Sequence, residues 1–506
     1  MLDIIVLSDL HLGRGKNPET GRYARLEAFF YDDDFADFCA HLVREAGDSG
    51  RRFKLVLNGD TFDLLRLEPD AAPTGRSRYC PAWTPAEAAA MMRQILDGHP
   101  RFVRGLGAIL SAGHEIVFLA GNHDAELQWE PVQEEVRRAL LAEVAKGAWA
   151  ASARDVVAWA SDNLRFEGWF HHEPGRIWIE HGCQYDPENA FRYQLRRRHV
   201  DLPDEMHRAE IDLPLGTFFQ RYLYNSFGNI TFIVPNARSN NRYFRWLMLN
   251  RPRMLARTFF VHLPFFLQVL RRLAKSAPDE APLRELHQAE LDDLSARSPL
   301  GDKLATIDEL KQASGQASIV ARQLIGRILK ASGYVLLGTF LAAALWMLGF
   351  NAIGSMSAGI GFKAVLFLTL NFLFLVLTIG ALTYLLLRPA STEADPHARA
   401  AAARIAHIAA VPIVTFGHTH DEIIARLPGG GDRPSWYFNT GTWIAVFTAD
   451  SLLPRERVQY TFLRVIGLRG ELLHWSPARG AATPVILLEE DRQLDASDRP
   501  PDVQPN

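Results

Sequence analysis

Short apolar runs alternate with longer stretches of helical periodicity from Met1 to about Gly182. The runs are rich in strand-forming residues, and each ends in a polar cluster, as in IIVLSD, FKLVLNGD, EIVFLAGNHD and RIWIEHG. Between them lie alanine-rich segments such as PAEAAAMMRQILDGHPRFVRGLGAIL, whose apolar positions repeat with a helical period. This alternation predicts an α/β fold, in which a rigid sheet carries the loops at its strand ends.

The pattern changes after about Asn189, where the sequence becomes rich in arginine and aromatic residues. We interpret residues 190–330 as a helical insertion. Its 254–273 segment, which includes MLARTFFVHLPFFLQVLRR, has a broad apolar surface with arginine on both sides. This pattern suits a helix at a membrane interface, and it equally suits a helix packed beneath the next segment. We expect Pro264 to kink this helix.

Two long apolar runs follow, Tyr334 to Phe350 and Ala364 to Leu387, and the second is long enough to cross a hydrocarbon core. An uncharged connector, NAIGSMSAGIG, joins them, so residues 331–390 are predicted to form a transmembrane helical hairpin. The alternative is a buried hairpin inside a soluble protein. Basic residues lie outside the pair and predict cytoplasmic ends at the inner membrane, with both termini cytoplasmic. They are Arg322, Arg327, Lys330 and Arg388.

The last part of the chain returns to the α/β pattern. An alanine-rich stretch, EADPHARAAAARIAHIAAV, leads to the apolar run IVTF and the turn GHTH, and further strand-like runs follow. Residues 391–478 are therefore assigned to the same core as residues 1–189. The tail, residues 479–506, is polar and contains proline, which predicts partial disorder.

The length, composition and net charge of the chain limit the number of domains, the partners and the compartment that can be expected. With 506 residues and 48% hydrophobic content, two or three domains are expected. The net charge of −3 and a pI of about 6.6 argue against a basic nucleic-acid binder, and no nucleic-acid partner is expected. Three scattered cysteines indicate a reducing compartment. The N-terminus has no basic segment before its apolar run, so we expect no cleavable signal and a cytosolic N-terminus.

Five strand-end clusters carry the candidate chemistry. Each is weak evidence alone, because an aspartate after a strand is usually a helix N-cap. In this order, each after an apolar run, they supply the oxygen and nitrogen donors that borderline divalent metals favour, without the thiolates of a structural zinc site. The clusters are Asp9-Leu10-His11, Gly59-Asp60 with Asp63, Gly121-Asn122-His123-Asp124, His181-Gly182 and Gly417-His418-Thr419-His420.

This set of motifs resembles the calcineurin-like metallophosphoesterase superfamily, whose pattern is DxH, GDxxD, GNH[DE], H and GHxH. The counterparts here are SDLHLG, GDTFD, GNHD, EHG and GHTH, and YFNTGT matches a further strand of the family. The resemblance covers about Met1 to Asn189 and Ile405 to Leu473. It implies a four-layer αββα sandwich with two metal ions at the strand ends, here interrupted by the helical insertion and the hairpin.

The resemblance also implies a role for each residue. Three residues hold one metal, three hold the other, and Asp60 bridges them; the two sets are Asp9, His11 and His420, and Asn122, His181 and His418. We expect Mn²⁺, with Fe and Zn as alternatives. By the same resemblance, the paired ions would lower the pKa of a bridging water so that hydroxide would attack the phosphorus. His123 then donates to the leaving oxygen and is oriented by Asp63.

Three further polar residues near these motifs receive interpretations of their own. Asp124 would either cap the next helix or support the site, and we favour the cap. His171 and His172 are interpreted as ordinary strand or turn residues, with a role around the site or the substrate as the alternative.

The sequence therefore predicts an enzyme, a metal-dependent phosphoric ester hydrolase, anchored in the membrane. Basic residues around the hairpin favour a lipid phosphate or a lipid-linked nucleotide as substrate. The chain departs from the UDP-diacylglucosamine pyrophosphatase branch, which typically has Arg in place of His123 and GHTHRP in place of GHTHDE, so that substrate is not transferred. The alternatives are a soluble nucleotide or phosphoprotein substrate with the hairpin used only for anchoring, and a non-enzymatic metal-binding membrane scaffold.

Overall fold

The computed structural model divides the chain into two compact units. The first comprises Met1–Pro235, Ala277–Ala317 and Glu393–Asn506, and the second comprises Asn236–Ser276 and Ser318–Thr392. The stretch that we predict as one insertion, residues 190–330, is thus divided between the two units. The residues that the structure describes are 2–67, 83–147, 153–198, 212, 214–227, 232–233, 251–275, 279–313, 315, 317–387, 395–428, 434–447 and 458–485.

The first unit contains two mixed β-sheets, which confirms the predicted α/β class. In the larger sheet, four neighbouring parallel strands are extended by three antiparallel ones, in the order β14 (Ala481–Pro484), β13 (Arg469–Ser476), β12 (Thr461–Ile466), β1 (Asp3–Leu7), β2 (Phe53–Asn58), β3 (Glu115–Leu119) and β4 (Leu164–Glu167). In the smaller sheet, parallel strands lie between antiparallel edge strands, in the order β5 (Phe170–Glu173), β6 (Ile177–Glu180), β8 (Ile413–Phe416), β10 (Ser435–Thr440) and β9 (Glu422–Leu427). Two short strands, β7 (Phe232–Ile233) and β11 (Val446–Phe447), pair separately.

The apolar runs of the central strands are buried on both faces. Every residue of β2, β6 and β8 is buried, as expected for parallel strands that are covered on both sides. One apolar cluster joins the two sheets; it includes Ile4, Val56 and Val117 of the larger sheet and Ile179 and Ile413 of the smaller one. Burial of each such side chain contributes roughly 1.5–3 kcal/mol, so this cluster is a main source of stability.

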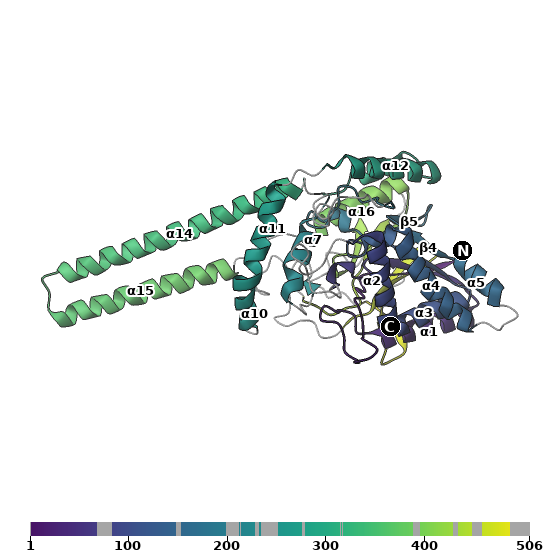
Figure 1. Ribbon diagram of the computed structural model, residues 1–506, viewed down its shortest axis with the longest axis horizontal. Coiled ribbons are helices and arrows are strands. Elements are labelled where there is room, and N and C mark those ends of the chain that lie inside the picture. The colour runs from purple at the N-terminus through teal and green to yellow at the C-terminus, as the bar shows by residue number, and fades with distance from the viewer. Residues whose placement is uncertain are drawn as a thin grey trace. The chain divides into compact units, whose positions relative to one another are not determined.

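Helices pack on the sheets of the first unit (Figure 1). The larger sheet is accompanied by α1 (Asp32–Ser49), α2 (Pro85–Gly98), α3 (Pro100–Ser111), α4 (Glu130–Gly147) and α5 (Ala153–Asp162). The smaller sheet is covered by α16 (Asp395–Ala409), with α12 (Ala281–Arg297) and α13 (Lys303–Asp308). A second apolar cluster holds this layer, and in it Ile405 and Leu304 pack with Trp178 and Phe416.

The alanine-rich segment after Trp83, for which a helical period is predicted, forms two helices. The helix α2 begins with a capping box in which Thr84 and Glu87 bond each other's backbone N–H groups. It ends before His99, whose backbone is not helical, and α3 begins at Pro100. Proline has no N–H and disfavours helical backbone in the residue before it, which explains the break.

Strands from before and after the second unit lie side by side in the same sheets. The strand β8 pairs in parallel with β6, with Ile413 opposite Ile177, and β12 pairs with β1, with Val465 opposite Ile4. The chain therefore leaves the first unit and returns to it. This places the loop after β8, which carries the GHTH motif, beside the loop after β6.

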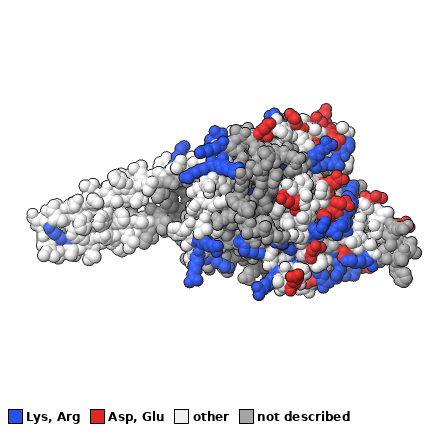
Figure 2. Space-filling model, in the orientation of Figure 1, with Lys and Arg blue, Asp and Glu red and all other residues white. Residues whose placement is uncertain are grey.

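The second unit contains two long apolar helices, α14 (Ala317–Ser355) and α15 (Ile360–Leu387). Within them, Leu336–Ser355 and Ile360–Thr378 are long and apolar enough to cross a membrane, and neither stretch is buried inside the protein. Their surface carries almost no charged side chains (Figure 2). The alternative of a buried hairpin in a soluble core is therefore not what the structure shows.

The two apolar helices contact each other through polar and apolar pairs. The indole Nε1 of Trp346 donates to the Oδ1 of Asn371 over 3.3 Å, and the rings of Phe350 and Phe367 lie 4.6 Å apart. A Cβ on Gly349 would lie 3.1 Å from Leu370, so the small residue allows close approach. Small residues and interhelical hydrogen bonds are typical of helix pairs in lipid.

A second helical rod of this unit consists of α10 (Pro252–Arg257), the π-helical turn η5 (Thr258–His262) and α11 (Leu263–Lys275). The π-helical turn stands directly before the position at which we expect Pro264 to distort the helix. Because Pro264 has no N–H and its ring would meet the carbonyl four residues earlier, a wider turn accommodates it.

Candidate metal centre

The five polar clusters follow β1, β2, β3, β6 and β8 directly in sequence. The carboxyl ends of parallel strands meet at one edge of a sheet, so three clusters lie at an edge of the larger sheet and two at an edge of the smaller one. Among the candidate residues His123 is partly exposed, and the others are buried: Asp9, His11, Asp60, Asp63, Asn122, His181, His418 and His420. Asp9 and His420, which are 411 residues apart in sequence, thus reach one buried place.

The backbone is strained at this cluster. Eight non-glycine residues in the described part of the chain have a positive φ, and five of them are predicted metal ligands. Left-handed backbone costs such residues of order 1–3 kcal/mol each and concentrates at functional sites. The five, with φ between 49° and 68°, are Asp9, His11, Asp60, His418 and His420.

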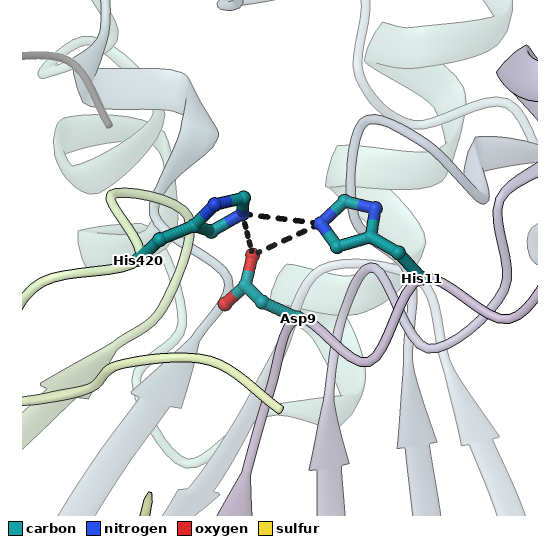
Figure 3. A group of neighbouring side chains, drawn as sticks. All are labelled: Asp9, His11 and His420. Atoms are coloured by element: carbon teal, nitrogen blue, oxygen red, sulfur yellow. Dashed lines mark hydrogen bonds and ion pairs between the residues drawn. The ribbon is translucent and has the colours of Figure 1, made fainter. Parts of the chain in front are cut away.

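Asp9, His11 and His420 form the first group (Figure 3). The two Nε2 atoms of His11 and His420 lie 3.1 Å apart, and the Oδ1 of Asp9 lies 3.2 Å from that of His420 and 3.8 Å from that of His11. This buried Oδ1 accepts no aligned hydrogen bond in the described structure, whereas Oδ2 is held by Ser8 and by the backbone N–H of His418. Burial lowers the pKa of His11 to about 4, so its ring is neutral at pH 7. Two imidazole nitrogens and one carboxylate oxygen that converge in this way fit a divalent cation.

Asp60 and His181 form the centre of the second group. The Oδ2 of Asp60 lies 3.2 Å from the Nε2 of His181 and 3.8 Å from that of His11, so this carboxylate lies between the two groups. Burial alone would raise the pKa of Asp60, but the charge of His181 outweighs it and holds the pKa well below its ordinary value. The Oδ1 of Asn122 lies 3.2 Å from the same nitrogen of His181. His418 completes a set that could hold a metal with Asp60 and His181.

A third set of donors, His11, Asp60 and His123, has the spacing of a possible metal site as well. The resemblance assigns His123 to the leaving group rather than to a metal. Its contacts suit that assignment: Nδ1 lies 2.9 Å from the Oδ1 of Asp63, which fixes the ring. Burial lowers the pKa of His123, but Asp63 and Asp60 outweigh it, so the pKa is raised.

Asp186 is a site residue that the motifs do not indicate. Its Oδ2 lies 2.9 Å from the Nε2 of His418 and accepts a hydrogen bond of 2.6 Å from the side-chain amide of Asn189. A carboxylate at one imidazole nitrogen orients the ring, so a metal contact of His418 would fall to Nδ1. Asp186 stands five residues after His181 in a segment without regular pattern, so no sequence signal was available for it.

Asp124 is not the helix cap that we favour from the sequence. The short helix that follows it, η2 (Ala125–Gln128), has no side-chain cap. Its carboxylate instead accepts hydrogen bonds from the backbone N–H groups of Gly121, Asp60, Thr61 and Phe62, at 2.6 to 3.2 Å. Asp124 therefore ties the loop after β3 to the loop after β2, which is the alternative role.

Close backbone approach around the site requires glycine at two positions. Gly59 has a φ of 76°, and a Cβ there would lie 2.5 Å from the ring of His181. A Cβ on Gly121 would collide with the carboxylate of Asp60. Glycine thus lets loops from three strands meet without strain at these points.

The strand β10 and the turn after it hold two of the loops. The side-chain amide of Asn439 donates to the carbonyl of Gly417 over 2.7 Å and to the hydroxyl of Thr419 over 3.0 Å. The hydroxyl of Thr442 donates to the carbonyl of Asp9 over 2.7 Å. The segment YFNTGT therefore fixes the backbone of the GHTH turn and of the first loop.

Glu27 fixes the loop after His11 and is also missed by the motifs. Its carboxylate accepts hydrogen bonds from the backbone N–H groups of Gly13 and Gly15. It lies 3.5 Å from the Nε2 of His99, whose Nδ1 lies 3.0 Å from Asp32. Burial alone would lower the pKa of His99, but the two carboxylates raise it to about 9.

His171 takes part in a separate cluster. Its Nδ1 lies 3.0 Å from Glu167 and its Nε2 lies 3.2 Å from the ammonium of Lys54, at the start of β2 rather than at its end. His172 packs beside Trp178. These contacts fit the interpretation of both histidines as ordinary strand residues.

No protein-family model matches this chain, and a comparison with curated proteins gives no match either.

Proposed function

We propose that this protein is a metal-dependent phosphoesterase whose active site is the buried cluster at the strand ends. The observation that carries the proposal is the convergence of Asp9, Asp60, His181, His418 and His420 from four different strand ends, four of the five with left-handed backbone. A structural cluster of histidines would not require strained backbone at three of the four contributing loops. Helices on both sides of two packed sheets further support the αββα sandwich that the resemblance implies.

The donor set fits two divalent ions, with Mn²⁺ as the first choice. One ion would be held by Asp9, His11 and His420, and the other by Asn122, His181 and His418, with Asp60 between them. When bound, such ions act as Lewis acids and neutralise the charge of a phosphate group. Neutral imidazoles and ionised carboxylates are the forms that bind metal. His11 is neutral at pH 7, and the proton that Asp60 favours on His181, whose pKa is raised to about 10, would be displaced on metal binding.

His123 is the residue that would move a proton. Its side chain is 12% exposed, the most of the five histidines in the cluster, and Asp63 holds it through Nδ1. Its Nε2 is then the atom that donates to the leaving oxygen. The carboxylates of Asp63 and Asp60 raise the pKa of His123, which favours the protonated imidazole that such a donation needs.

The hairpin formed by α14 and α15 would anchor this unit to a membrane. Strands on both sides of the hairpin pair within one sheet, which requires both ends of the hairpin to lie on the same side of the membrane. Two spans satisfy this requirement, and the basic flanks predict the cytoplasmic side. We therefore propose a phosphate ester or pyrophosphate of a membrane lipid or lipid-linked nucleotide as the substrate class.

A substrate screen tests the proposal. Detergent-solubilised protein would receive Mn²⁺ with lipid phosphates, nucleotide-linked lipids, or soluble cyclic and linear nucleotides. We expect metal-dependent phosphate release that is fastest on a lipid substrate. Equal turnover of soluble nucleotides would support the anchoring-only alternative, and no turnover of any phosphoester with metal bound would contradict enzymatic function.

A further inference from the structure

Charge is divided very unevenly between the two units. The second unit carries 14 Lys and Arg residues and no Asp or Glu in its 116 residues. The rest of the chain carries the remaining 41 Lys and Arg residues and all 58 Asp and Glu residues, a formal charge of −17. The overall charge of −3 therefore hides a strongly cationic unit, which is the same unit that contains the apolar hairpin.

The helical rod α10–η5–α11 presents part of this charge on one exposed stripe. Exposed positions recur every three or four residues along the rod, so they lie on one face. Basic residues stand near both ends of the stripe, and its centre is apolar, with Phe260 83% exposed and Val261 42% exposed. The exposed residues of the stripe are Arg253, Arg257, Phe260, Val261, Pro264, Gln268, Arg271 and Lys275.

The opposite face of the rod is covered. Phe266, Val269, Leu270 and Leu273 are buried, so the apolar residues of this face already have packing partners inside the protein. Figure 1 shows the rod running across the direction of α14 and α15 rather than along it. The exposed stripe is thus a separate face of the rod, with an aromatic residue at its centre and basic residues near both ends.

We propose that this stripe lies on an anionic phospholipid bilayer, with Phe260 and Val261 in the headgroup region and the four basic residues against lipid phosphates. The inference rests on the proposed membrane hairpin, which belongs to the same unit. An apolar centre flanked by basic residues is the pattern of an interfacial helix. From Arg257 to Arg271 the rod extends about 21 Å, so its basic ends reach several headgroups at once. The absence of any carboxylate in the unit removes the repulsion that an anionic surface would otherwise exert.

The test uses the full chain in lipid nanodiscs with a fluorophore on the stripe. Gln268→Cys provides the label position in a Cys80→Ser background. Cys39 and Cys183 are buried, and burial raises the pKa of both thiols, so they react poorly. The discs contain phosphatidylcholine alone or with phosphatidylglycerol, and brominated lipids serve as quenchers.

We expect quenching in anionic discs at low salt, and its loss at high salt, where charges are screened. Substitution of Arg253, Arg257, Arg271 and Lys275 by Gln should lower the docking constant at least about tenfold, since each cation near the membrane contributes severalfold. The matched control removes four exposed charges of the first unit; Gln replaces Arg44, Arg104, Arg284 and Lys303 and should leave quenching unchanged.

Two results would overturn the inference while leaving the hairpin intact. They are equal quenching in neutral and anionic discs, and unchanged quenching in the variant that lacks the four basic residues of the stripe. Failure of the full chain to enter discs at all would overturn the membrane hairpin, and with it this inference.

Discussion

Asp186 offers a sharp test of the site because the motifs do not include it. Asp186→Asn keeps the shape of the side chain but removes the charge that faces the Nε2 of His418 over 2.9 Å. Both side chains are nearly buried, at 8% and 5% exposure, so solvent does not screen this contact. Loss of such a partner typically weakens metal binding by about 10- to 100-fold, which corresponds to about 1.4–2.7 kcal/mol.

The assay is a calorimetric titration of metal-depleted protein with Mn²⁺. We expect the affinity of the site that contains His418 to fall by that factor, and the site that contains Asp9, His11 and His420 to change little. The control is Asp308→Asn, which removes a carboxylate 3.2 Å from another buried imidazole, that of His287. Unchanged affinity in Asp186→Asn, or an equal loss in Asp308→Asn, would refute the positioning role.

Three further predictions follow from other contacts. His123→Ala should keep the metal content, measured by elemental analysis, and lose most turnover on substrates with poor leaving groups; loss of metal would show that His123 is a ligand instead. The pKa of His99 is about 9 in the folded protein and about 6.5 when unfolded, so its protonated ring stabilises the fold fully below about pH 6.5 and this contribution disappears as the pH rises through 9. The contribution is on the order of 3 kcal/mol, so the melting temperature of the wild type should fall between pH 7 and 10, and that of His99→Gln should not. The same pH dependence of the melting temperature in both proteins would contradict this role of His99. Asn371→Leu should destabilise the hairpin by about 0.6–1.7 kcal/mol, measured by the detergent concentration at which a protease cleaves the connector between α14 and α15. Equal protease resistance of the variant and the wild type would mean that the hydrogen bond between Asn371 and Trp346 does not stabilise the hairpin.

The strands and their ends could be predicted because β2, β6 and β8 are continuous apolar runs that end abruptly in polar residues. That the donors within each sheet would meet could also be expected, since the ends of its parallel strands share an edge. That the donors of the two sheets would meet was implied only by the resemblance. The roles of Asp124 and Asp186 could not be predicted, because the carboxylate of an aspartate in a loop can accept a hydrogen bond from whichever donor the fold brings near it. Only the approach of the loop after β2 decides that Asp124 binds backbone N–H groups there instead of capping a helix.

The residues at which the insertion begins and ends could not be predicted from the sequence either. The sequence of α12 and α13 is largely polar, and its few apolar residues do not show which surface covers them. In the structure Leu291, Leu304 and Ile307 pack in one cluster with residues of α16, so residues 277–317 belong with the α/β unit. The long apolar helices could be predicted more directly, since length and composition alone show that they could cross a membrane.

The measurement that tests the central proposal most directly is Mn²⁺ binding and phosphodiester hydrolysis by Asp60→Asn in the same preparation. Asp60 is the carboxylate that lies between the two donor groups, 3.2 Å from His181 and 3.8 Å from His11. The wild type should bind two ions per chain and hydrolyse a chromogenic phosphodiester only when they are bound. The variant should bind fewer ions and lose hydrolysis by at least about a hundredfold. Hydrolysis at the wild-type rate by a variant that still binds two ions would contradict the proposed centre.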